Sequence, residues 1–344
     1  MIVQGNNRGK RFELTDKTLV FGRNELADIV IKDTGISKKH CRFSIIGNEM
    51  AVTDLESTNG TFLDGARIKG TEIFPIESLV RIGQHVLKHE YRRREDVEAE
   101  EHLQEDLSKA VSYVLSLLPH PETNEFAAID WTFLPSVYLG GDAFGYNDID
   151  EDHFAFYLID VCGHGVGAAM HSISVINVLR NQSLAKVDFR NPAEVLTGLN
   201  HIFQMEDHGD LYFSIWYGVY QKSLRSLRYS SAGHPPSLLV SADQTRAQNL
   251  KTKGMAIGAI PKVQYKEDKV VVSVGDVLYI YSDGACEVTT KEGAEWTLFA
   301  FQQVLIESRE TGSPYTMKIK DKVESISGTD KWDDDFSLVA VEFR

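Results

Sequence analysis

Residues 153–170 read HFAFYLIDVCGHGVGAAM, and this stretch decides the class of fold. Its unbroken apolar run, from Phe154 to Ile159, predicts a buried strand. The run closes on Asp160, a residue type that disfavours both strands and burial. Glycines at alternate positions follow, and residues 164–180 are expected to form a helix. A strand that passes through an acidic, glycine-rich turn into a helix predicts a layered α+β domain.

The alternation of strands and helices continues over residues 122–344. Further strands are expected at Ile129–Tyr138, Leu211–Tyr220, Ser226–Ser231, Val270–Val272, Val277–Tyr281 and Phe336–Phe343, and further helices at Pro192–Met205 and Glu295–Glu310. A short turn joins two of these strands, Leu211–Tyr220 and Ser226–Ser231, so this pair is expected to be antiparallel.

Other aspartates occupy similar positions in this region. Asp142 follows two glycines, Asp283 closes the apolar strand VLYIYSD, and Asp334 directly precedes the last strand. Several carboxylates sharing one site would force one another to take up protons unless bound cations compensate their charge. Oxygen ligands without paired His or Cys favour Mg²⁺ or Mn²⁺. Two such ions can activate a water molecule and neutralise a phosphoryl group.

The motifs LLPHP, GGDAFGY, DVCGHGVGAAM, SAGHPP, YSDGACE and DDFSLVAV occur in this order from Leu117 to Phe343. This set resembles the metal-dependent protein phosphatases (PPM), specifically their bacterial SpoIIE-type branch. The resemblance implies a four-layer α-β-β-α sandwich, a centre of two Mn²⁺ or Mg²⁺ ions, and hydrolysis of serine/threonine phosphoproteins. By position, it implies that the metal ligands are Asp142, Asp160, Asp283, Asp334 and the backbone carbonyl of Val161.

The catalytic acid departs from the family pattern. In the eukaryotic phosphatases a histidine lies two residues after the second aspartate, where this chain has Cys162. His164, four residues after that aspartate, is the candidate for protonating the leaving alkoxide. The alternative is that His164 only begins the following helix.

Residues 1–91 have a different pattern. Short apolar strands are separated by Gly, Asn and Asp clusters, which predicts an all-β sandwich or barrel. Three motifs fall on its loops: Gly22-Arg23, then Ser37 to His40, then Ser57 to Thr61.

The order and spacing of these motifs resemble the forkhead-associated (FHA) domain, a phosphothreonine-binding sandwich. An arginine fork and a serine hydroxyl are chemically suited to phosphate. The resemblance implies that the phosphopeptide-binding residues are Arg23, Ser37, Lys38, Thr58 and Asn59.

Between the two regions, residues 92–118 contain no Gly or Pro, and their apolar residues recur every three or four positions from Leu103. This spacing predicts an amphipathic helix. Two interpretations stay open: a spacer packed on the next domain, or a short coiled coil that pairs two chains into a homodimer. The predicted division is therefore an FHA domain at 1–91, a linker helix at 92–118 and a phosphatase domain at 119–344.

Charge is distributed unevenly. Residues 1–95 carry 16 Lys and Arg against 13 Asp and Glu, a net +3, whereas the rest carries 20 against 37, a net −17. This balance disfavours nucleic-acid binding. The absence of a long apolar run disfavours a membrane protein, and three cysteines without a CxxC pair indicate a reduced, cytoplasmic location.

Together these patterns predict a bacterial signalling phosphatase. Its FHA domain would dock a phosphothreonine protein such as a Ser/Thr kinase, and its substrate class by family resemblance would be STAS-domain anti-sigma-factor antagonists. The alternative is a scaffold that binds phosphothreonine and whose phosphatase domain is catalytically silent.

Overall fold

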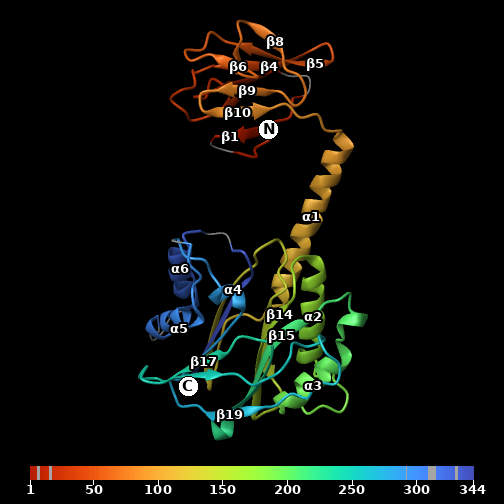
Figure 1. Cartoon of the computed structure of the whole chain (residues 1–344), viewed down its shortest axis with the longest axis vertical. Coiled ribbons are helices and arrows are strands. Elements are labelled where there is room, and N and C mark those ends of the chain that lie inside the picture. Colours follow the sequence, from red (N-terminus) through yellow and green to blue (C-terminus); the bar gives the residue numbers. More distant parts are fainter. Residues whose placement is uncertain (6–7, 15–17, 292, 309–314, 330–331) are drawn as a thin grey trace. The chain divides into compact units, whose positions relative to one another are not determined.

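The computed structural model describes residues 1–5, 8–14, 18–291, 293–308, 315–329 and 332–344 (Figure 1). The chain divides into two compact units, Met1–Leu103 and Gln104–Arg344. Among the described residues, no helix combines the length and the apolar character needed to cross a bilayer.

The first unit is a β-sandwich. Its described residues form two five-stranded sheets, ordered β1-β10-β9-β6-β7 and β3-β2-β4-β5-β8. The strands are β1 Ile2–Gln4, β2 Leu19–Gly22, β3 Ile29–Val30, β4 Cys41–Ile46, β5 Glu49–Asp54, β6 Thr61–Leu63, β7 Ala66–Arg67, β8 Thr71–Ile73, β9 Leu79–Ile82 and β10 His85–Lys88. Phe21 and Phe43 from one sheet pack in one core with Val80 and Ile82 from the other. The predicted all-β sandwich is confirmed.

Two more sheets form the second unit. Over its described residues, one sheet has the order β11-β12-β21-β20-β17-β18 and the other β13-β14-β15-β16-β19. The strands are β11 Glu122–Thr123, β12 Ala127–Leu134, β13 Ala143–Asp148, β14 His153–Val161, β15 Phe213–Gln221, β16 Ser226–Ala232, β17 Ser237–Val240, β18 Ala247–Leu250, β19 Asp268–Val271, β20 Val277–Tyr281 and β21 Phe336–Phe343. The pairing of β15 with β16 is antiparallel, as predicted.

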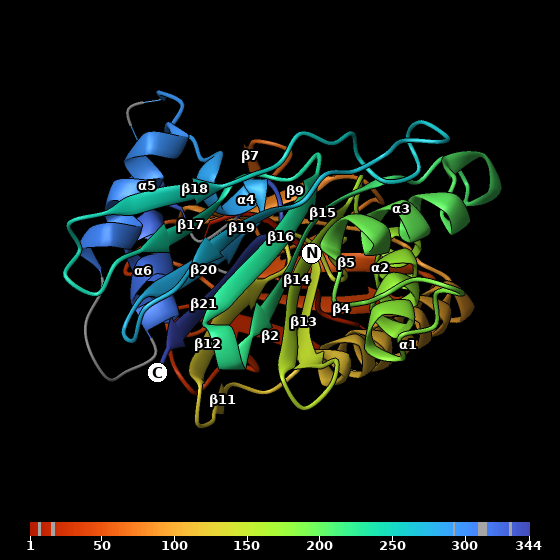
Figure 2. The ribbon, with the colours of Figure 1, turned by 90° about the horizontal axis from the view of Figure 1, so that it is seen from below.

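Helices cover the outer faces of both sheets (Figure 2). The helices of the chain are α1 Arg94–Leu117, α2 Val166–Arg180, α3 Pro192–Ile202, α4 Asp283–Cys286, α5 Leu298–Glu307 and α6 Tyr315–Ser327, with short 3₁₀ turns at Met205–Asp207 and Lys222–Leu224. Val175 of α2 and Leu196 of α3 pack in the core that holds β14 and β15. Phe301 of α5 and Ile319 of α6 pack on β20 and β21. The α-β-β-α sandwich is confirmed.

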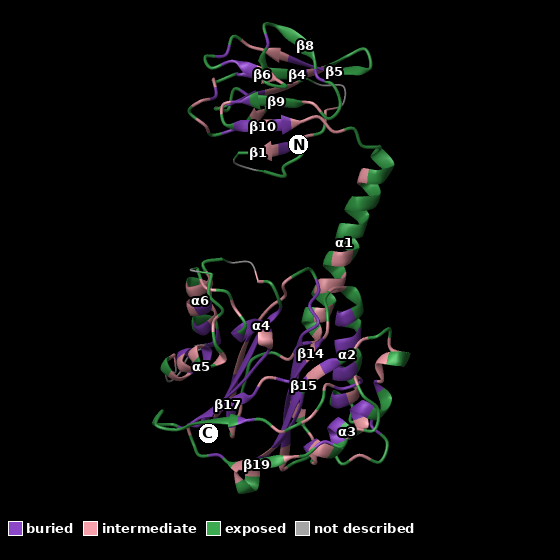
Figure 3. Cartoon of the chain, viewed as in Figure 1, coloured by how far each residue is buried: buried purple, intermediate pink, exposed green. Residues whose placement is uncertain are grey.

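Burial explains why these strands are so apolar. Seven of the nine residues of β14 and seven of the nine of β15 are buried, and Figure 3 shows both strands almost entirely in the colour of buried residues. A strand in a sheet that is covered on both faces needs a near-continuous apolar run, and residues 154–159 have this pattern.

Helix boundaries differ from the predictions at glycines and caps. The helix predicted over 164–180 begins at Val166, because Gly163 and Gly165 have left-handed φ angles of 82° and 90°. The one predicted over Pro192–Met205 ends at Ile202. The one predicted over Glu295–Glu310 is α5, and residues 309–310 lie outside the described residues.

Candidate functional site

Two of the predicted ligands lie where β14 ends. Asp160 stands opposite Ser214 of β15, whose hydroxyl donates to its Oδ2 at 3.5 Å. The chain then turns through Cys162–Gly165 into α2. A Cβ built on Gly141 would lie only 2.5 Å from the carbonyl oxygen of Val161. Gly141 therefore allows the loop that carries Asp142 to pack directly against the end of β14.

The other two aspartates come from the second sheet. Tyr281, near the end of β20, pairs with Leu338 near the start of β21, so the segments beyond these residues share one edge of the sheet. Asp283 begins α4 at this edge, and Asp334 precedes β21. A Cβ on Gly284 would lie 2.3 Å from the backbone oxygen of Asp335, so glycine permits this close approach of the two segments.

Electrostatics shows that the carboxylates from both sheets influence one another. Burial raises the pKa of Asp142 well above its usual range, and the carboxylates of Asp160 and Asp335 raise it further. Burial, followed by the carboxylates of Asp283, Asp334 and Asp335, raises the pKa of Asp160 to about 7. Burial and Asp334 also raise the pKa of Asp283. The four predicted ligands therefore lie in one region of unfavourable negative charge.

Asp335 connects the segments that carry these ligands. Its side chain is buried, and Oδ1 accepts hydrogen bonds from the backbone N–H of Ser136 at 2.8 Å and from its hydroxyl at 3.0 Å. Oδ2 accepts from the N–H of Asp142 at 3.2 Å. The hydroxyl of Ser282 donates to the backbone oxygen of Asp335 at 3.0 Å. The sequence motifs did not identify Ser136 or Ser282 as part of the site, because a lone serine on a loop has no distinguishing pattern.

The residues present fit a divalent cation by charge and by donor type. Asp142 Oδ2 is buried and has no hydrogen-bond partner among the described residues, although a carboxylate oxygen there needs compensation. The four aspartates supply carboxylate oxygens, which suit Mg²⁺ or Mn²⁺. As placed, no three His, Cys, Asp or Glu side chains of the described residues are grouped closely enough to hold one ion. Ion binding would therefore require these carboxylates to come closer together.

An open cavity of about 420 Å³ adjoins two of the aspartates. Asp283 and Asp334 line it together with Glu287 and Trp332. The cavity thus gives solvent and solutes access to this side of the cluster. His164 lies outside this lining, exposed in the turn between Gly163 and Gly165.

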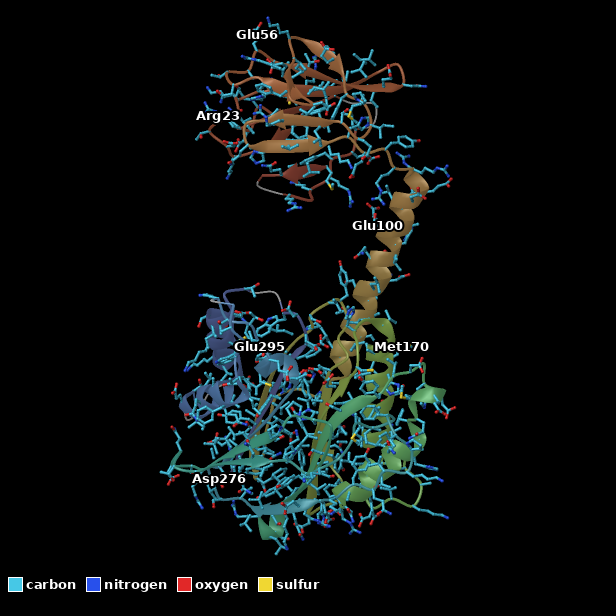
Figure 4. The ribbon with its side chains drawn as sticks, viewed as in Figure 1. Arg23, Glu56, Glu100, Met170, Asp276 and Glu295 are labelled. Atoms are coloured by element: carbon cyan, nitrogen blue, oxygen red, sulfur yellow. The ribbon has the colours of Figure 1, made fainter. Side chains whose placement is uncertain are left out.

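In the N-terminal unit, the three predicted loops meet. The N–H of Arg23 donates to the oxygen of Ser37 at 3.0 Å, and the N–H of Thr58 donates to Ser37 Oγ at 3.0 Å. Asn59 Nδ2 donates to the oxygen of Gly35 at 2.8 Å. The side chains of Arg23, Lys38, Thr58 and Asn59 are exposed, and Figure 4 shows Arg23 at the surface of its unit. The structure therefore brings all five predicted phosphopeptide residues together.

His40 supports these loops from inside. Its Nδ1 accepts from the N–H of Ser37 at 3.1 Å, which leaves the ring proton on Nε2 to donate to the oxygen of Gly60 at 3.2 Å. Burial lowers the pKa of His40, so the neutral ring with this tautomer is favoured.

Comparison with known proteins agrees with this geometry. A family model described as "Stage II sporulation protein E (SpoIIE)" matches residues 150–344, more than half of the chain. The chain belongs to the SpoIIE family. The SpoIIE-family region is similar to phosphoserine phosphatase RsbU of Bacillus subtilis, with 24% identity over 220 residues, 64% of this chain and 64% of RsbU. Its fold is that of the SiaA-PP2C domain of Pseudomonas aeruginosa, with a TM-score of 0.61 and 18% identity over 72% of this chain and 99% of that domain.

The region that precedes the SpoIIE-family match resembles other proteins. A model described as "Inner membrane component of T3SS, cytoplasmic domain" matches residues 1–91. FHA domain-containing protein FhaB of Mycobacterium tuberculosis is 35% identical over 88 residues, 26% of this chain and 57% of FhaB. The predicted resemblances to FHA domains and to SpoIIE-type phosphatases are thus both confirmed. The chain spans less than two thirds of the length of these two curated relatives.

Proposed function

We propose that the protein is a metal-dependent phosphatase that hydrolyses phosphoserine or phosphothreonine in a partner protein. The observation that carries this proposal is the aspartate cluster, in which carboxylates from both sheets raise one another's pKa and leave a buried oxygen of Asp142 without a partner. A site that concentrates so many carboxylates favours cations, and the family match supports a phosphate ester as the substrate.

In this proposal, Asp142, Asp160, Asp283, Asp334 and the carbonyl of Val161 hold two Mg²⁺ or Mn²⁺ ions. When bound, such ions provide Lewis acidity toward a phosphoryl group and make water a better nucleophile at neutral pH. Asp335 keeps the Asp142 loop in position through its hydrogen bonds. His164 is the proposed proton donor to the leaving alkoxide, because it is exposed in the turn that directly follows Asp160 and Val161.

The N-terminal unit is proposed to dock a phosphothreonine protein such as a Ser/Thr kinase, with the phosphate between Arg23, Ser37 and Thr58, Lys38 beside it, and Asn59 holding the peptide backbone. The contacts among these loops support this assignment.

The proposed division is an FHA domain at 1–91, a linker helix at 92–118 and a phosphatase domain at 119–344. The protein would act in the cytoplasm, with a STAS-domain anti-sigma-factor antagonist as the proposed substrate.

A homodimer through the linker is part of the proposal. All 24 residues of α1 are described and none is buried, although apolar side chains recur along the helix. Leu103 and Tyr113 are 59% and 63% exposed. A second copy of the helix would cover such side chains.

Hydrolysis of para-nitrophenyl phosphate by the full chain tests the catalytic proposal. The substrate needs no docking, so it reports on the metal site alone. Activity should require Mn²⁺ or Mg²⁺ and should be lost in Asp142→Ala and in Asp283→Ala. Absence of turnover at every metal concentration, together with binding of phosphothreonine peptides, would instead identify the silent scaffold.

A further inference from the structure

An arginine pair flanks one aromatic side chain on the outer face of the β7-β6-β9 sheet. Phe62 of β6 stands opposite Arg67 of β7 on one side and opposite Arg81 of β9 on the other. Their neighbours along β9, Val80 and Ile82, are buried in the core, so the three side chains occupy the opposite, outer face. Both arginines are exposed. We refer to Arg67, Phe62 and Arg81 as the arginine row.

This row is continuous with the phosphopeptide loops. A Cβ built on Gly60 would lie 2.5 Å from Nε of Arg67 and 3.0 Å from its Cζ, so the guanidinium packs directly on Gly60. Gly60 also has a left-handed φ of 82°, and it follows Asn59, whose side chain is exposed. A peptide held by Asn59 would therefore lie next to Arg67.

The guanidinium groups of the arginine row are restrained by their neighbours and are not paired with carboxylates of the described residues. The Cζ atom of Arg81 lies 3.9 Å from the centroid of the Phe62 ring, a cation–π contact that restricts the side chain. Among the described residues, neither Arg67 nor Arg81 forms an ion pair, whereas Lys88 of the same sheet is paired with Glu77. A guanidinium that is already ordered loses less entropy when it binds a carboxylate or phosphate.

We propose that the arginine row extends the phosphothreonine site and selects peptides with an acidic side chain near the phosphothreonine. The ligand class is a phosphothreonine peptide with Asp, Glu or a second phosphorylated residue, since each presents oxygens that match the planar arginine fork. This inference rests on the proposed docking function of Arg23 and its loops, and it adds the kind of partner that the unit prefers.

Fluorescence anisotropy with the full chain tests the inference. The probes are alanine-based peptides with one phosphothreonine, in which Glu, or Gln as the neutral match, is placed in turn at each flanking position, and a third set carries phosphoserine there. The wild-type protein should bind the best-placed Glu peptide roughly 3- to 10-fold more tightly than its Gln match. The phosphoserine set shows whether a second phosphate is preferred over a carboxylate.

Variants separate the row from the phosphate loops. Arg67→Ala and Arg81→Ala should each reduce the preference for Glu, measured as the ratio of the Gln-peptide Kd to the Glu-peptide Kd, to less than about twofold. Arg67→Lys keeps the charge without the fork and should retain part of the preference. Arg93→Ala, which removes an exposed charge outside the row, should change neither affinity.

Two results would overturn the inference while leaving phosphothreonine docking intact. One is equal affinity of the wild-type protein for Glu and Gln peptides at every position. The other is an unchanged preference in both Arg→Ala variants. The three atoms nearest to a Cβ built on Gly60 all belong to Arg67, and Arg81 stands on the other side of Phe62. The Arg81 variant therefore stays informative even if loss of the Arg67 side chain loosens the turn. If no phosphothreonine peptide binds, the docking function itself fails, and the inference fails with it.

Discussion

Asp335 is the residue whose role is best defined by its contacts. Its carboxylate joins Ser136 to the N–H of Asp142, and its backbone oxygen accepts from Ser282, which precedes Asp283. Residues that orient metal ligands in this way commonly affect metal affinity by 10- to 100-fold.

We therefore predict that Asp335→Ala raises the Mn²⁺ concentration needed for half-maximal hydrolysis of para-nitrophenyl phosphate by about 10- to 100-fold. Asp333→Ala is the matched control, because it removes an exposed carboxylate two positions away in the same acidic run. An equal Mn²⁺ requirement in the two variants would show that Asp335 does not position the site.

The raised pKa of Asp160 predicts how the stability of the fold depends on pH. Its folded-state pKa of about 7 is higher than the unfolded value of roughly 4, so the folded chain binds more protons between these values. This contribution to stability is fully present below about pH 4 and is lost as the pH rises toward 7. In protein treated with a chelator, the thermal midpoint of wild type relative to Asp160→Asn should fall across this window. A constant difference between the two proteins would contradict the assignment.

At the scale of elements, what could be predicted depended on how regular the pattern was. The β14–α2 unit was predictable because its apolar run is continuous and Gly163 and Gly165 mark the turn. Helix α6 was not predicted, since its buried positions, such as Ile319 and Val323, are few and lie among charged residues.

The aspartates of the site could be predicted from the sequence, whereas the residues that hold their loops in place could not. An aspartate that ends an apolar strand is unusual enough to be noticed, as at Asp160 and Asp283. Ser136 is 199 residues away from Asp335, and only the folded sheet order brings the two together. Arg67 likewise reaches Gly60 through a strand register that no short motif encodes.

Helix α1 carries the element-scale prediction. Ala110 lies inside it, and a proline there removes a helical hydrogen bond at a cost of about 3 kcal/mol. Ala110→Pro should lower the proportion of dimer measured by light scattering, and it should change the phosphatase rate or the response of that rate to phosphothreonine peptide. Ala110→Ser, which keeps the helix, serves as the control. If dimer, rate and response all stay as in wild type, α1 neither pairs chains nor couples the two sites.

At the scale of the whole molecule, two compact units with separate cores should unfold separately. We expect two calorimetric transitions. A phosphothreonine peptide should raise the temperature of one of them, and Mn²⁺ should raise that of the other, because each ligand stabilises only the unit that binds it. Arg23→Ala should abolish the first shift and leave the second. A single transition that responds to both ligands would contradict independent units.

The repulsion stored in the aspartate cluster has a consequence for the life of the protein in a cell. If the cluster binds divalent cations as proposed, a chain without them keeps the mutual repulsion of these carboxylates and opens more readily. Proteases act on opened chains, so small differences in stability change abundance several-fold. On the same proposal, metal starvation would reduce the number of protein molecules as well as the activity of each one.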